Sequence, residues 1–194
     1  MTLRSLLLSD LARYDAVPRR AGAPPRRRLR ARLETILFRA GWHATVLYRL
    51  AHWCGLHGAV LLALAVCRVN LMLTGADIEF SASIGPGLLV VHPVGVVIGR
   101  GTTIGANATI FQGVTFGIRG WAPDELDRYP AVGDGCTFFA RCSVVGPVRV
   151  GRGATVGAHA LVLADVPAGT TAVGVPAQVR PAPAALQEVH RTCA

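Results

Sequence analysis

The chain contains no lysine, since all 20 of its basic residues are arginine. This absence excludes Schiff-base chemistry, proton abstraction by a lysine amine and a P-loop nucleotide site. Aromatic side chains are also scarce, at 6% of residues, whereas hydrophobic residues make up 52%. A chain of 194 residues with this aliphatic character is long enough to bury the core of one domain.

Cysteine is sparse as well, with five residues and no Cys-x-x-Cys pair. An odd number of thiols, without a recognisable secretion signal, predicts reduced cysteines and a cytoplasmic location. The longest apolar run, residues 58–75, contains Arg68 and Asn70. We therefore expect a packed helix there and not a membrane span.

The net charge of +9 belongs to one end of the chain. Residues 1–70 hold 12 arginines and 3 acidic residues, whereas residues 71–194 hold eight of each. We expect a basic, flexible arm over residues 1–28, which could meet phosphates or an anionic membrane surface but is more simply a solvated segment. The balanced remainder predicts no nucleic-acid partner.

Residues 29–75 have the spacing of α-helices. Apolar residues recur there every three or four positions, as in Leu33, Ile36, Leu37, Ala40, Ala44 and Leu47. Gly75 in "LTG" is typical of a helix C-terminus, so the helical segment is expected to end there.

After Gly75 the period becomes six. One series of large residues consists of Val132, Phe138, Val144, Val150, Val156 and Val162, and four positions after each comes a small or β-branched residue. A second series is Ile98, Ile104, Ile110 and Phe116, and a third, offset by two residues, is Ile78, Ile84, Val90 and Val96. Three hexads make one triangular coil of short strands, so residues 76–183 are predicted to form a left-handed parallel β-helix. The fold class is therefore mainly β with a helical N-terminal segment.

Residues 117–131 interrupt this repeat with "GIRGWAPDELDRYPA". Insertions of this kind map to loops on one face of a solenoid, often the binding face. We therefore expect a protruding loop there and a short tail over residues 184–194.

Five motifs together resemble the serine acetyltransferases of the hexapeptide-repeat family. They are "TGADIEF", "VVHPVGVVIG", "IFQGVTFG", the loop end "DRYP" and "TTAVGVPAQVR". The resemblance spans about residues 45–183 and implies an acyltransferase that moves an acetyl group from acetyl-CoA to the hydroxyl of serine or a serine-like molecule. No metal is implied.

By resemblance, His92 is the general base and Asp77 orients it. A base beside a hydroxyl makes it a nucleophile, and a carboxylate on the other imidazole nitrogen fixes the tautomer. The spacing of fifteen residues is close to one coil of eighteen, so both side chains can lie at one edge of the solenoid.

Three further positions are predicted to bind the substrate. Arg128 suits a carboxylate because its guanidinium can bind both oxygens. Tyr129 stands where the family has histidine, and Val91 stands where the family has an aspartate that faces the substrate ammonium. Losing that carboxylate indicates an altered acceptor, so another alcohol, a sugar or an amine is the alternative substrate class.

Coenzyme A in this family lies in the groove between neighbouring β-helices of a trimer. The resemblance assigns its contacts to Gly117, Ala140, Arg141, Ala158, Gly174 and Arg180. It also implies a homotrimer or a dimer of trimers. The chain ends in Ala194, not in the isoleucine that inserts into cysteine synthase, so no stable complex with that enzyme is expected.

A zinc hydratase and a non-catalytic scaffold are two other functions open to this fold. A zinc hydratase on the same fold needs three histidine ligands, but the repeat region contains only His92 and His159. A non-catalytic scaffold would not require Asp77, His92 and Arg128 together.

Overall fold

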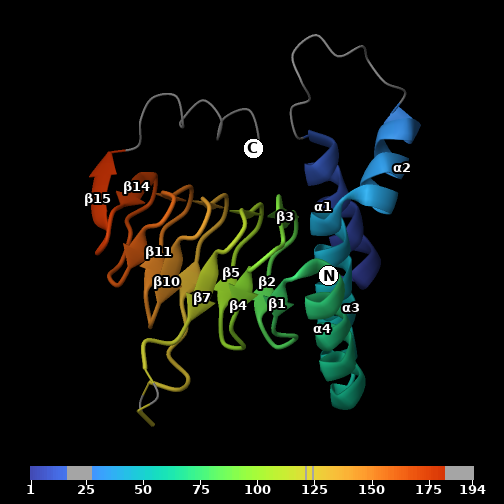
Figure 1. The fold of residues 1–194 in the computed structure, drawn as a ribbon, viewed down its shortest axis with the longest axis horizontal. Coiled ribbons are helices and arrows are strands. Elements are labelled where there is room, and N and C mark those ends of the chain that lie inside the picture. Colours follow the sequence, from blue (N-terminus) through green and yellow to red (C-terminus); the bar gives the residue numbers. More distant parts are fainter. Residues whose placement is uncertain (17–27, 121, 124, 182–194) are drawn as a thin grey trace.

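The computed structural model describes residues 1–16, 28–120, 122, 123 and 125–181. A group of helices packs against one end of a solenoid of short strands (Figure 1). Within the described residues the helices are α1 (Leu3–Ala16), α2 (Arg28–Phe38), α3 (Ala40–Leu56) and α4 (Val60–Thr74). Gly75 follows α4 in the left-handed conformation, with φ 75°, as glycine at a helix C-terminus commonly does. No helix in this described part is long and apolar enough to cross a bilayer.

The flexible arm expected over residues 1–28 is wrong for residues 3–16, which form α1. This helix packs against α3, and its Asp10 and Tyr14 are buried. Composition misled the prediction, because the arginine runs begin only at Arg19, after α1 has ended. The remaining part of the expected arm, residues 17–27, lies outside the described residues, as does the expected tail.

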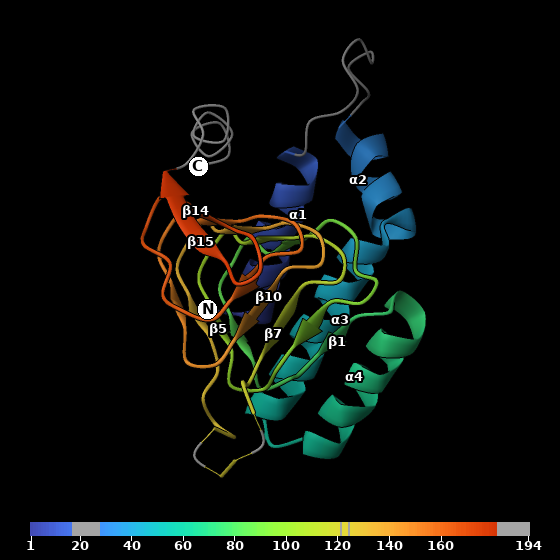
Figure 2. The ribbon, with the colours of Figure 1, turned by 60° about the vertical axis from the view of Figure 1, so that its left-hand side comes forward.

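The strands form three sheets, one on each side of a triangular coil, and Figure 2 views the solenoid obliquely. Sheet A contains β1 (Asp77–Ile78), β4 (Val97–Ile98), β7 (Thr115–Gly117), β10 (Ser143–Val145) and β13 (Leu161–Val162). Sheet B contains β2 (Ser83–Ile84), β5 (Thr103–Ile104), β8 (Ala131–Val132) and β11 (Arg149–Val150). Sheet C contains β3 (Leu89–Val90), β6 (Thr109–Ile110), β9 (Thr137–Phe138), β12 (Thr155–Val156), β14 (Thr170–Val173) and β15 (Gln178–Pro181). Their pairings are parallel except for the antiparallel β14–β15 hairpin.

The large and small residues of the predicted hexads fill the interior, which confirms the repeat. Val96 departs from the predicted series of large strand residues. It is buried, but Ile98, two residues later, occupies the inward position on β4. Cys136 and Cys142 are buried free thiols among the small residues. Burial raises the pKa of Cys136 to about 11 and that of Cys142 to about 12, so both stay protonated at neutral pH.

The first coil is longer than the regular ones. Asp77 pairs with Val97, 20 residues later, whereas Val97 pairs with Thr115, 18 residues later. Leu89 pairs with Thr109, again 20 residues later, so the two extra residues lie between Val90 and Val97. The two-residue offset between the hexad series has its structural cause in this insertion, and His92 lies within it.

The helices supply hydrogen bonds to the edge of the first coil that has no neighbouring coil. Unpaired strand groups at such an edge would otherwise face solvent or another chain. In chain order, the contacts are Cys67 Sγ with Ile78 O (3.4 Å), His52 Nδ1 with Phe80 O (2.7 Å), Tyr48 Oη with Ala82 O (2.7 Å), Arg49 with the carbonyls of Ile84 and Gly85, Asp10 Oδ1 with Leu88 N (2.8 Å), and Tyr14 Oη with Val90 O (3.0 Å). Side chains of α1, α3 and α4 thus take the place of a preceding coil.

A buried ion pair joins two of these helices. Arg49 Nε lies 2.9 Å from Asp10 Oδ2, and Arg49 Nη2 lies 3.1 Å from Asp10 Oδ1. The side chains are 1% and 0% exposed. Because both charges are desolvated, each depends on the other and on the backbone groups it binds.

We expect Asp10→Asn to lower the free energy of unfolding by about 3–5 kcal/mol, since it leaves the buried Arg49 charge without its partner. Asp15→Asn on the same helix is the matched control. Asp15 pairs with Arg32 at 2.7 Å, but the Arg32 side chain is 55% exposed. Its loss should therefore cost less than about 1 kcal/mol. Urea unfolding measures both, and equal losses would contradict a structural role for the buried pair.

Candidate active site

One edge of the solenoid, where the chain turns from sheet C to sheet A, carries His92. We call it the His92 edge; it consists of residues 91–96, 111–114, 139–142 and 157–160. Its turns are stacked by backbone hydrogen bonds, which run from Gly113 N to Val94 O (3.0 Å), from Arg141 N to Gln112 O (2.8 Å) and from His159 N to Ala140 O (3.0 Å). Side chains from different coils therefore form one continuous column.

His92 is exposed on this edge, in the turn that contains the two extra residues. The turn is closed by a hydrogen bond from Val96 N to Pro93 O at 3.0 Å, and Pro93 is buried. Within the described part of the chain, neither ring nitrogen of His92 forms a hydrogen bond. The imidazole is thus accessible to a substrate.

Asp77 lies at the same edge, one layer nearer to the helices. Its N–H donates to Val96 O at 2.8 Å, and Gly95 N donates to Gly75 O at 2.8 Å. The fifteen-residue spacing of Asp77 and His92 predicted that both residues would lie at one edge of the solenoid, and this placement agrees with it. The carboxylate is exposed and makes no hydrogen bond to His92 or to any other residue that the structure describes. The contact between Asp77 and His92 therefore stays a prediction.

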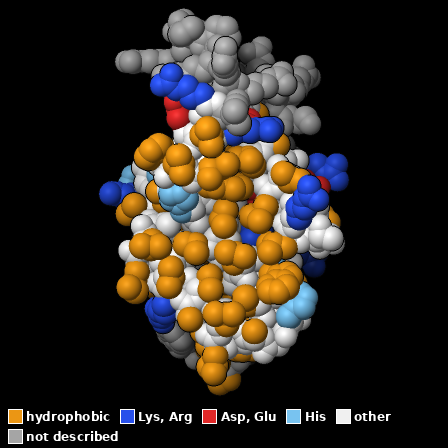
Figure 3. All heavy atoms as spheres, turned by 90° about the vertical axis from the view of Figure 1, so that its right-hand side faces the viewer, with side chains coloured by type: hydrophobic (Ala, Val, Ile, Leu, Met, Phe, Trp, Pro, Cys, Tyr) orange, Lys and Arg blue, Asp and Glu red, His pale blue; other side chains and the backbone are white. Residues whose placement is uncertain are grey.

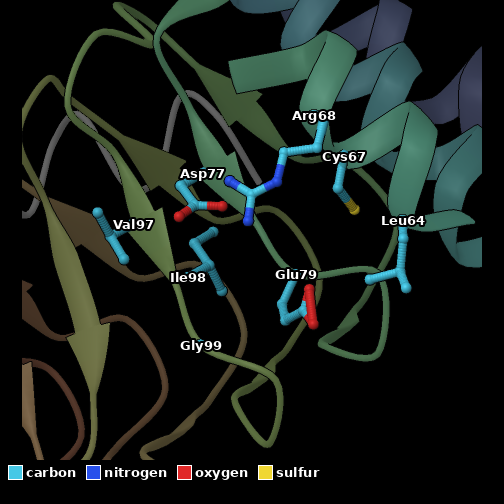
Figure 4. A pocket seen from close by; sticks show the side chains of 8 residues that line it. All are labelled: Leu64, Cys67, Arg68, Asp77, Glu79, Val97, Ile98 and Gly99. Atoms are coloured by element: carbon cyan, nitrogen blue, oxygen red, sulfur yellow. The ribbon is translucent and has the colours of Figure 1, made fainter. Parts of the chain in front are cut away.

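A pocket of about 290 Å³ opens beside Asp77, between α4 and sheet A (Figure 4). Its lining consists of Leu64, Cys67, Arg68, Asp77, Glu79, Val97, Ile98 and Gly99. The Arg68 guanidinium points toward Asp77. Burial, with a smaller effect of Glu79, raises the pKa of Cys67 and keeps this thiol protonated. Neither this pocket nor any other place in the described residues has three or more ligating side chains arranged for a metal ion.

Three of the residues predicted to contact coenzyme A lie on the His92 edge. Ala140 and Ala158 occupy equivalent places in successive turns, one coil apart. Arg141 is exposed, has φ 59° and extends its aliphatic stem over Gly113. The structure therefore aligns these three positions with His92 along the solenoid axis.

Two other predicted coenzyme A contacts lie at the far end of the solenoid. Gly174 belongs to the turn between β14 and β15, and its carbonyl accepts a hydrogen bond from Leu161 N at 3.0 Å. This turn therefore follows the His92 edge at its C-terminal end. Arg180 is exposed on β15, opposite Thr171.

Gly117, Arg128 and Tyr129 lie at a different edge. Gly117 ends β7 at the start of the long loop, which projects from the solenoid (Figure 1). The Tyr129 ring covers Gly99 and Gly101, where a β-carbon on either glycine would overlap it. Tyr129 thus anchors the loop to the turn between β4 and β5.

Arg128 and Asp127 make ion pairs within and beside this loop. Arg128 Nη1 lies 3.1 Å from Glu125 Oε1, and Asp127 Oδ1 lies 3.1 Å from Arg100 Nη2. The Asp127 side chain is 89% exposed, so its ion pair links the loop to Arg100 only weakly. Because the loop joins sheet A to sheet B, one chain does not bring Arg128 to His92.

Val91 has a packing role that explains an apolar residue beside His92. It is half-buried and packs against the apolar cluster of Tyr14, Trp42 and Leu89. A carboxylate at this position would contact that cluster and lose hydration. Val91, in place of the family aspartate, therefore suits the apolar contact that α1 and α3 make with β3.

Sequence reasoning missed three residues on the His92 edge. Phe111 and Phe139, in successive turns, stack with ring centroids 5.2 Å apart. Gln112 has its Oε1 buried without a hydrogen-bond partner among the described residues. The signal was present in "IFQG" and "FFAR", where aromatic residues follow the inward residue of a hexad and therefore point outward.

Comparison with known proteins gives a consistent family. No family model matches the chain. The serine acetyltransferase of Mycobacterium tuberculosis is 42% identical over 147 residues, which is 76% of this chain and 63% of that enzyme. The serine acetyltransferase of Helicobacter pylori J99 is 39% identical over 149 residues, covering 77% of this chain and 86% of that enzyme.

Solved structures agree in fold. Soybean serine acetyltransferase complexed with serine has a TM-score of 0.80 and 35% identity, covering 92% of this chain and 69% of the soybean chain. Serine acetyltransferase from Brucella abortus in complex with coenzyme A has a TM-score of 0.79 and 30% identity, covering 91% and 66%. The left-handed β-helix predicted from the hexads is therefore confirmed, and the chain belongs to the serine acetyltransferase family.

Proposed function

We propose that this protein is an acetyl-CoA-dependent O-acetyltransferase that acts on serine, with His92 as the general base. The observation that carries the proposal is the alignment of exposed His92 with Ala140, Arg141 and Ala158 along one edge. Related enzymes are named serine acetyltransferases, and solved relatives have been crystallised with serine and with coenzyme A. These relatives support both substrates.

In the proposed reaction His92 removes the proton of the acceptor hydroxyl as its oxygen attacks the thioester carbonyl. A C–O bond forms, the C–S bond breaks, and the coenzyme A sulfur takes a proton. Asp77 would hold the imidazole in the tautomer that presents an unprotonated nitrogen. The products are the acetyl ester and free coenzyme A.

The His92 edge has the chemistry expected of a coenzyme A groove. Ala140 and Ala158 leave the backbone accessible, and the stacked rings of Phe111 and Phe139 offer an apolar wall. Arg141, and at the far end Arg180, are the candidates for the phosphates.

A homotrimer, or a dimer of trimers, would complete the site. Arg128 lies at a different edge from His92 in one chain, so a neighbouring copy is the simplest source of the substrate-binding arginine. Apolar side chains also gather on the helical end of the molecule (Figure 3). Among them, Leu61 is 84% and Met72 is 80% exposed, which supports further association through α4.

A different acceptor is the second candidate, because Val91 removes a carboxylate partner for an ammonium group. A thiol-release assay across hydroxy amino acids, amino alcohols and sugars distinguishes it from serine. The cytoplasmic location stays a prediction. So does the absence of a stable cysteine synthase complex, whose predicted cause lies in the tail outside the described residues.

His92→Ala should lower kcat for acetyl transfer to L-serine by about 10²–10⁴-fold, because the general base is lost. Asp77→Asn should lower it less, because the imidazole remains. Thiol release measures both rates, and calorimetry should find coenzyme A affinity unchanged. His57→Ala, at the exposed end of α3, is the control. Transfer at the wild-type rate in His92→Ala would refute the proposed mechanism.

Complementation tests the shared site. His92→Ala and Arg128→Ala should each be nearly inactive as homotrimers. If each site takes His92 from one copy and Arg128 from the next, every mixed trimer holds two copies of one variant and one of the other, and therefore restores one of its three sites. Co-expression from one plasmid with two tags, followed by tandem purification, isolates the mixed species. Mixed trimers as inactive as the parents would contradict a site shared between chains.

A further inference from the structure

Val90 precedes the His92 turn and lies on the uncovered edge of sheet C. The neighbouring N–H groups of Leu89 and Val91 donate to Ala108 O and Ile110 O of the next coil, at 2.9 and 2.8 Å. The N–H and C=O of Val90 point in the opposite direction, toward the helices, where the solenoid has no further coil. Both therefore need a partner from the helices.

A single hydroxyl satisfies both groups. Tyr14 Oη accepts a hydrogen bond from Val90 N at 3.1 Å and donates one to Val90 O at 3.0 Å. The Tyr14 side chain is 2% exposed, and its ring packs edge-on against Trp42 with centroids 5.8 Å apart. Burial raises the pKa of Tyr14, so the hydroxyl keeps its proton and can donate at any pH the enzyme meets.

The imidazole itself has few restraints. His92 follows Val90 by two residues, is exposed and makes no hydrogen bond with the described residues. Its location is therefore set by the backbone that enters the turn. That backbone is held on one side by Ile110 O, through Val91 N, and on the other by Tyr14.

We propose that Tyr14 is a positioning residue for His92, acting through the backbone of Val90. The inference rests on the proposed role of His92 as general base. In this proposal α1, which ends at Ala16, long before the first strand begins at Asp77, fixes the position of the base relative to the acceptor hydroxyl. A displacement of about 1 Å at a reacting group can cost about 10²-fold in rate.

The chain provides a matched control in Tyr48 of α3. Tyr48 Oη donates to Ala82 O at 2.7 Å and accepts from Ile84 N at 3.2 Å. Its side chain is 0% exposed. It therefore makes the same kind of bridge on the same uncovered edge, but on β2, eight residues before His92 and beyond an intervening corner.

The test compares Tyr14→Phe with Tyr48→Phe in the full-length protein. Both lose one buried hydroxyl and both should lower the urea midpoint by similar amounts. Tyr14→Phe alone should lower kcat for L-serine by about tenfold or more, with the KM for acetyl-CoA unchanged. NMR signals of the His92 imidazole should shift or broaden in Tyr14→Phe and stay unchanged in Tyr48→Phe. Thr45→Val, which removes a hydroxyl 3.2 Å from Tyr14 Oη, is the milder variant if Tyr14→Phe does not fold.

The outcomes separate the two proposals. Equal kcat values for the two tyrosine variants, or an unchanged His92 imidazole signal in Tyr14→Phe, would overturn the positioning role while leaving His92 as base. Full activity in His92→Ala would instead overturn the proposed function. In the His92→Ala background, Tyr14→Phe should cause no further loss of residual transfer, because the group that it positions is already absent.

Discussion

The open end of the β-helix is the constraint on which the rest of this structure depends. Every coil except the first satisfies its backbone through the coil before it. The first coil has no such neighbour, and six side chains from α1, α3 and α4 take its place. They contact backbone groups in succession from Ile78 to Val90. Because Arg49 and Asp10 are buried within this set, their charges stabilise one arrangement and penalise the alternatives.

These six side chains, which we call the helical cap, connect the helices to the turn that carries His92. The last group that it satisfies is Val90, and the next turn contains His92 and two extra residues. From there the same edge continues through Gln112, Ala140 and Ala158 to the turn at Gly174. His92 and the proposed coenzyme A groove thus share one stacked column, whereas the loop with Arg128 leaves from another edge. In the proposed trimer, Arg128 therefore reaches the site from a neighbouring copy.

Sequence periodicity was sufficient for the solenoid, because each hexad position has one inward direction and the sequence repeats it coil after coil. The sequence showed a two-residue offset between series, but because the third series was continued to Val96, only the strand register located the insertion that contains His92. The helical cap could not be predicted from the sequence, because Tyr14 and Val90 are 76 residues apart and no local pattern connects them. The same reason explains the missed helix α1, since its burial depends on partners in α3 and β3. Arg128 and Tyr129 were identified by motif, but their pairing with Glu125 and with Gly99 and Gly101 needed three-dimensional placement.

Native-state amide hydrogen exchange tests the cap most directly. The N–H groups of Ile84, Leu88 and Val90 point away from the solenoid, toward Tyr48, Asp10 and Tyr14. If these side chains replace a coil, the three amides should exchange as slowly as those of Leu89 and Val91, which bond to the next coil. Exchange of the three amides at the rate of an exposed strand edge, with Leu89 and Val91 still protected, would contradict the account.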